Sequence, residues 1–118
     1  MIYKKIYLVL PLLLPSLVFS AEKDINTVWC ASVGGDDEYR TKDGTYVDCL
    51  TDEYAIEAEY DYKWKEGIGQ ALHYAESTNR KAAILFIKRA KSRKDYYNEM
   101  MRVINRYDLP IRIFVIEE

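Results

Sequence analysis

The sequence predicts a single mixed α/β domain in which strands and helices alternate along the chain. Three observations lead to this fold class. Two stretches have apolar residues at helical spacing, residues 64–76 and 94–107, and each is followed by a short apolar run. Ahead of them, an Asp-Gly turn joins two candidate strands. The length of 118 residues suits one domain.

Each expected element has its own local signal. The first helix ends at the Gly34-Gly35 pair, and Asp43-Gly44 marks a hairpin turn. Residues 82–87 form a continuous apolar run, as expected for a strand buried on both faces. The expected order is α-β-β-β-α-β-α-β, with a mixed sheet flanked by helices. In chain order the elements are a helix at 22–33, strands at 38–41, 45–50 and 54–60, a helix at 64–76, a strand at 82–87, a helix at 94–107 and a strand at 111–116.

The first twenty residues have the pattern of a secretory signal peptide. Lys4 and Lys5 precede an apolar run over residues 6–19, and Ser20 supplies a small residue before cleavage. An uncleaved anchor is the alternative, but the run has 14 residues, whereas a spanning helix needs about 20. We therefore expect a signal peptide at 1–20 and a periplasmic or secreted domain at 21–118, without membrane association after cleavage. That domain has 98 residues and a formal charge of −4.

The two cysteines have two interpretations. In an oxidising compartment Cys30 and Cys49 form a disulfide that closes a loop of 20 residues. Such a loop is worth about 3 kcal/mol in the chain-entropy model. Otherwise they are buried thiols that pack as small apolar residues. Together with His73, the sole histidine, they supply fewer than the four ligands of a usual structural zinc site. The disulfide is the favoured interpretation.

Three acidic residues on neighbouring strands suggest a cation site. Glu57 and Glu59 share one face of their strand, because residues two apart point the same way. Hairpin pairing brings Asp48 of the preceding strand next to Glu57. Carboxylates converging in this way suit a hard cation such as Mg²⁺, which keeps several of its waters. The alternative is that they are ordinary solvated residues of a half-exposed strand.

The same residues carry a resemblance to a known family. Asp48 on the second strand and Glu57-x-Glu59 on the third resemble the PD-(D/E)XK nuclease superfamily, and Gln70 to Tyr74 looks like its Gln-x-x-x-Tyr motif. The chain is also similar to a group of small, exported bacterial nuclease-like proteins. The residues that carry this similarity are Trp29-Cys30, Gly34-Gly35, Glu38, Asp43 through Thr51, Ala55-Ile56-Glu57, Lys63-Trp64 and Ile68 through Tyr74.

The resemblance implies a restriction-endonuclease-like domain at 21–118 and a role for several residues. Asp48 and Glu57 would bind Mg²⁺ or Mn²⁺, with Glu38 as an outer partner. Gln70 and Tyr74, one helical turn apart, would position the nucleic acid or brace the site. The expected function is metal-dependent hydrolysis of phosphodiester bonds in nucleic acid.

One position departs from the family pattern. The superfamily usually has a lysine where this chain has Glu59, and a carboxylate cannot stabilise negative charge in the transition state. Lys63, just beyond the strand, is a candidate substitute, as is a second cation between Glu57 and Glu59. Without either, the domain is a catalytically inactive module that binds a protein partner in the cell envelope. A third interpretation is an envelope protein of unrelated role.

The charge distribution has one further feature. The overall acidity argues against a protein that binds nucleic acid through bulk charge alone. Residues 88–94 nevertheless contain five Lys or Arg. They either contact phosphates or form a solvated connection between a strand and a helix.

Overall fold

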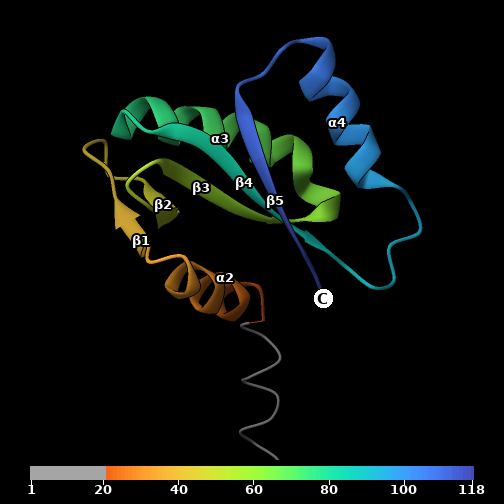
Figure 1. Ribbon diagram of the computed structural model, residues 1–118, viewed down its shortest axis with the longest axis horizontal. Helices are drawn as coiled ribbons and strands as arrows, with labels where there is room; N and C mark the ends of the chain where they lie inside the picture. Colours follow the sequence, from red (N-terminus) through yellow and green to blue (C-terminus); the bar gives the residue numbers. More distant parts are fainter. Residues whose placement is uncertain (1–20) are drawn as a thin grey trace, which may run out of the picture.

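A five-stranded mixed sheet lies at the centre of the structure, a computed structural model that describes residues 21–118 (Figure 1). The strands lie in the order in which they occur in the sequence. The first two pairs are antiparallel, and the last two pairs are parallel. The strands are β1 (Asp36–Arg40), β2 (Tyr46–Leu50), β3 (Tyr54–Tyr60), β4 (Lys81–Lys88) and β5 (Ile111–Glu117).

Helices cover both faces of this sheet. On one face lies α2 (Ala21–Ser32), and on the other lie α3 (Trp64–Thr78) and α4 (Tyr96–Arg106) (Figure 1). A 3-10 turn, η1 (Asp61–Lys63), joins β3 to α3. The predicted α/β class, the mixed sheet and the order of helices and strands are confirmed. None of the helices within residues 21–118 is long and apolar enough to cross a membrane. The predicted signal peptide falls on residues 1–20, outside the described part of the chain.

The predicted ends of several elements were wrong, for local reasons. The last helix was expected from residue 94 but begins at Tyr96, because the Asp95 carboxylate caps it by accepting a hydrogen bond from Asn98 N at 3.0 Å. The helix expected to end at 76 continues to Thr78 and stops at Asn79, which has a left-handed φ of 54°. The first strand begins at Asp36, two residues earlier than expected.

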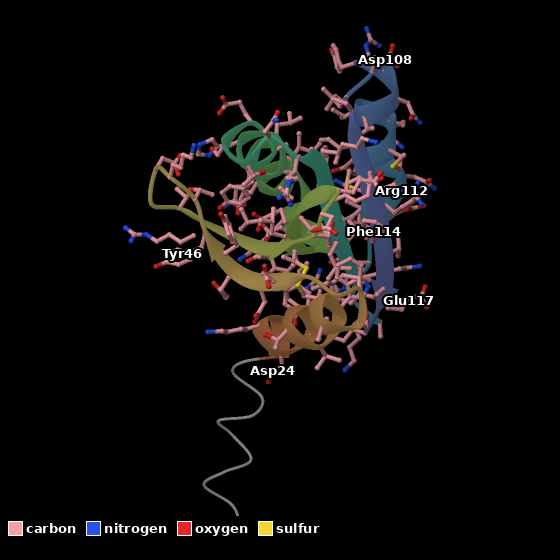
Figure 2. All side chains as sticks on the ribbon, turned by 60° about the vertical axis from the view of Figure 1, so that its left-hand side comes forward. Asp24, Tyr46, Asp108, Arg112, Phe114 and Glu117 are labelled. Carbon is pink, nitrogen blue, oxygen red and sulfur yellow. A yellow bond between two sulfur atoms is a disulfide. The ribbon has the colours of Figure 1, made fainter. Side chains whose placement is uncertain are left out.

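The predicted disulfide between Cys30 and Cys49 is confirmed. It joins α2 to β2 with 5.7 Å between the Cα atoms, and Figure 2 shows it in yellow between the helix and the sheet. Both residues are fully buried. Their close surroundings require a glycine at position 35, where a Cβ would lie 2.5 Å from the Cys49 sulfur and 2.8 Å from the Cys30 sulfur. The disulfide therefore holds α2 against the face of the sheet formed by Ile56, Ala58 and Leu85.

Candidate functional site

Asp48 is fixed where β2 and β3 diverge. One of its carboxylate oxygens, Oδ2, accepts a hydrogen bond from Ala58 N at 2.8 Å, in the place of a backbone ladder bond. Its carbonyl accepts a hydrogen bond at 2.9 Å from the side chain of Asn26, a buried residue of α2. The β2–β3 register pairs Leu50 with Ala55 and Cys49 with Ile56, and it ends there, one residue before Asp48 on β2 and Glu57 on β3. The pairing of Asp48 with Glu57 stays a prediction, and the sequence gave no signal for the role of Asn26.

Glu57 and Glu59 lie on the face of β3 that packs against α3. Ile56, which precedes Glu57, and Ala58, which lies between the two glutamates, face α2 instead. Both glutamates are buried, with 6% and 7% of their surface exposed. Gly67 of α3 allows this close packing, because a Cβ there would lie 3.3 Å from the Glu59 Cγ. The predicted shared face is confirmed, whereas the interpretation of these two acids as solvated residues was wrong.

Tyr74 of α3 lies among these acids. It is nearly buried and packs with Val47, Leu50 and Ala55. Burial raises the pKa of the Tyr74 phenol, and nearby negative charges raise it further. The acids that contribute are, in decreasing order, Glu57, Asp48, Asp43 and Glu59. We call Asp48, Glu57 and Glu59 the carboxylate cluster, which concentrates negative charge between the sheet and α3.

A second acidic group ties the β1–β2 turn to α3. The Asp43 carboxylate accepts hydrogen bonds from the hydroxyl groups of Thr41 and Thr45, and its Oδ2 lies 2.9 Å from Nε2 of His73. The Thr41 hydroxyl is the largest cause that holds the pKa of Asp43 well below its usual range, followed by Thr45. His73 is half exposed, so this contact joins the β1–β2 turn to α3 at the surface of the protein. The pairing of His73 with Asp43 was not predicted.

The remaining candidate residues lie around this region with different exposure. Gln70 is exposed on α3, one turn before the buried Tyr74. Lys63 ends η1, and its Nζ lies 5.8 Å from the centre of the Tyr62 ring. Glu38 is exposed on β1 with a φ of 54°, and the β1–β2 register places it opposite Asp48.

Carboxylates are the predicted ligands of the cation site. Within residues 21–118 no group of three or more His, Cys, Asp or Glu side chains is arranged to hold a metal ion. A set formed by Asp48, Glu57 and Glu38 together is therefore not present in this arrangement. Mg²⁺, however, often binds through one or two carboxylates and keeps its waters, so Asp48 and Glu57 fit that chemistry as a pair. The magnesium or manganese site stays a prediction.

Among curated proteins, the chain is similar to a KilA-N domain-containing protein of Acanthamoeba polyphaga mimivirus, with 30% identity over 100 residues. The aligned stretch covers 85% of this chain but only 39% of the viral protein. The chain thus spans about two fifths of the length of the curated relative it matches. No family model matches the chain. No solved structure matches it either. The resemblance to PD-(D/E)XK nucleases therefore stays a prediction.

Proposed function

We propose that this chain is a nuclease-like domain of restriction-endonuclease-like fold that hydrolyses phosphodiester bonds of nucleic acid with Mg²⁺ or Mn²⁺. One observation supports this most directly. The Asp48 carboxylate is held by the backbone N–H of Ala58, the residue that follows the buried Glu57 on β3. Two acids fixed on adjacent strands, one of them buried, form a preorganised oxygen donor pair for a hard cation.

Each residue of the pair has a defined task in this proposal. The Ala58 N–H engages one oxygen of Asp48, and the second oxygen has lone pairs to offer a cation. The buried Glu57 supplies charge where surrounding protein weakens solvent screening. A bound divalent ion would supply Lewis-acid stabilisation of the phosphate and lower the pKa of a bound water.

Gln70 and Lys63 would act on the substrate, whereas Tyr74 would act on the acids. Gln70 is exposed on α3 and offers an amide N–H to a phosphate oxygen. Tyr74 is buried beside the carboxylate cluster, where it braces the acids rather than contacting the nucleic acid. Lys63 ends η1 and presents a cation in place of the family lysine.

The buried Glu59 makes the proposed reaction strictly metal-dependent. It adds negative charge to a site whose chemistry would create more, so a divalent cation has to balance both. Hydrolysis without added metal is therefore not expected.

Nuclease assays on residues 21–118 test the proposal. Plasmid, linear duplex and single-stranded substrates would be incubated with Mn²⁺, Mg²⁺ or EDTA. Asp48→Asn and Glu57→Gln should each reduce the rate at least about 100-fold, the loss typical when a catalytic group is removed. Glu66→Gln, a change of an exposed acid on α3, is the matched control and should retain the rate. Equal activity in all four proteins, or none in the wild type, would refute the proposal.

The second candidate is a catalytically inactive binding module on the same fold. The observation that favours it is the buried Glu59 at the position of the family lysine. Calorimetric titration separates the two candidates. No heat from Mn²⁺, together with recovery of a protein partner in a pull-down, supports the module. Mn²⁺ binding that Asp48→Asn abolishes supports the nuclease.

We also propose that the domain works outside the cytoplasm. The buried Cys30–Cys49 disulfide supports this location, since structural disulfides persist mainly in oxidising compartments. Mass spectrometry of the protein from fractionated cells is the test. A mature N-terminus at Ala21 in the periplasm or medium is expected, and a cytoplasmic full-length chain would refute the location.

A further inference from the structure

One connection concentrates a third of the positive charges of an acidic domain in seven residues. Residues 88–94 link β4 to α4 and contain five Lys or Arg and no acidic residue. The rest of residues 21–118 has a formal charge of −9. In Figure 1 this connection leaves the end of β4 and runs outward before it turns back to α4. Segregation of charge on this scale attracts a polyanion to one place on the surface.

Not all of these cations are neutralised within the protein. Lys88 lies 3.7 Å from a Glu117 oxygen, and Lys94 lies 2.7 Å from a Glu99 oxygen. In contrast, Lys91 and Arg93 are exposed and form no ion pair with any residue between 21 and 118. They are therefore available for an external anion.

A buried acid holds the connection in place. Asp61 of η1 is 1% exposed, and its carboxylate accepts hydrogen bonds from Arg89 Nε at 2.8 Å and from the Ser92 hydroxyl. This anchor places the Arg89 guanidinium 4.2 Å from the centre of the Tyr62 ring. A connection already fixed at two points loses less conformational entropy when it binds a ligand.

The anchored connection borders a pocket with the chemistry for a nucleotide. The pocket has a volume of about 270 Å³ and lies against the start of α4. Its lining combines cations and aromatic rings with two acids that are already hydrogen-bonded within the protein: Lys88, Arg93, Lys94, Phe86, Tyr96, Tyr97, Ser92, Asp61 and Asp95. Asp95 already caps the helix end, so recognition of an anion would fall to the cationic side chains. Cations beside aromatic rings are the usual means of binding single strands.

We propose that residues 88–94, with Tyr96 and Tyr97, form a binding surface for the phosphate backbone of single-stranded nucleic acid. The identity of the polymer rests on the proposed nuclease function, whereas the surface uses none of the carboxylate cluster. A lipid surface fits less well, because Ala90 is the single apolar residue of the segment and offers nothing to insert into a bilayer.

Fluorescence anisotropy in EDTA tests this surface without any hydrolysis. A labelled 12-nucleotide single-stranded DNA would be titrated with residues 21–118 at 50, 100 and 200 mM salt. The double variant Lys91→Glu/Arg93→Glu should weaken binding at least about tenfold and reduce the salt slope by about 1.4, since each phosphate contact on a single strand contributes about 0.7. These two exposed side chains form no ion pair within residues 21–118, so the free energy of unfolding should be unchanged. Circular dichroism would verify this.

The matched control reverses two charges elsewhere. Lys23 of α2 and Lys42 of the β1–β2 turn are exposed, and Lys23→Glu/Lys42→Glu should change the Kd less than twofold. Equal losses in both double variants would overturn the proposal, as would absence of binding by the wild type at 50 mM salt. Binding to vesicles with 30% anionic lipid but not to the oligonucleotide would overturn it too. Oligonucleotide binding without Mn²⁺-dependent cleavage would refute the nuclease and leave this surface standing.

Discussion

Reduction of the Cys30–Cys49 disulfide should remove a large part of the stability of the domain. The bond joins residues 19 apart in sequence, and a closed loop of this size is worth about 3 kcal/mol in the chain-entropy model. Domains of this length are stable by about 5–15 kcal/mol in total. At about 4–8 °C for each kcal/mol, the Tm should fall by about 12–24 °C.

The measurement compares oxidised and reduced wild-type protein. Urea unfolding followed by circular dichroism gives the free energy of unfolding with and without a phosphine reductant. Reduction leaves both sulfur atoms in the core, so the comparison separates the cross-link from loss of packing. A difference below about 1 kcal/mol would refute the entropic reasoning.

Gly35→Ala provides an independent check on the same site. Its Cβ would lie 2.5 Å from the Cys49 sulfur, so in the oxidised protein this change should cost at least about 2 kcal/mol. Replacing both cysteines with alanine removes the sulfur atoms that the new methyl group meets. The cost of Gly35→Ala should then fall by at least about 1 kcal/mol in a double-mutant cycle. Additive effects would show that the sulfur atoms are not the obstacle.

Two glycines of α3 and one buried acid give further predictions. Gly69→Ala should stabilise the domain by about 0.5–1 kcal/mol in thermal unfolding, because it lies in a helix and its Cβ would meet nothing within 4 Å. Gly67→Ala should lack this gain, since its Cβ meets the neighbouring glutamate; an equal gain would contradict the packing described. Asp61→Asn should cost about 2 kcal/mol, less than a fully buried pair because Arg89 is about a third exposed. Burial alone would raise the Asp61 pKa, but the hydrogen bonds from Ser92 and Arg89 outweigh it and lower the pKa. The stability that the Asp61 carboxylate contributes should therefore be present above its unfolded pKa near 3.8 and be lost as the pH falls below that value. In an acid titration, Asp61→Asn should accordingly lose less stability than the wild type.

The features that sequence could predict are those set by local periodicity. Alternation along residues 54–60 correctly placed Glu57 and Glu59 on one face of β3. The continuous apolar run at 82–87 correctly indicated a strand buried on both sides. The two cysteines allowed only one pairing, and the predicted export to an oxidising compartment favoured the disulfide over two buried thiols.

The features that could not be predicted depend on contacts between distant elements. The hydrogen bond from Ala58 N to Asp48 replaces a backbone bond, and no pattern of side chains announces it. The sequence around Asp61 indicates only a turn, and the contact with Arg89 exists because β4 ends beside η1 in the fold. The close packing of Glu59 against α3 depends on Gly67, and the periodicity of a strand does not predict how closely a helix approaches it.

The order of the strands has a consequence for how the chain assembles. Because each strand pairs with its neighbour in sequence, every new strand meets an edge that has already formed. During synthesis, which begins at the N-terminus, the sheet can therefore grow from the N-terminal hairpins toward β5. No strand has to insert between two others. Pairing of sequence neighbours keeps the contact order lower than insertion of a strand would, which favours faster folding. Both cysteines belong to the first half of this series, so the cross-link can close before the parallel strands are in place.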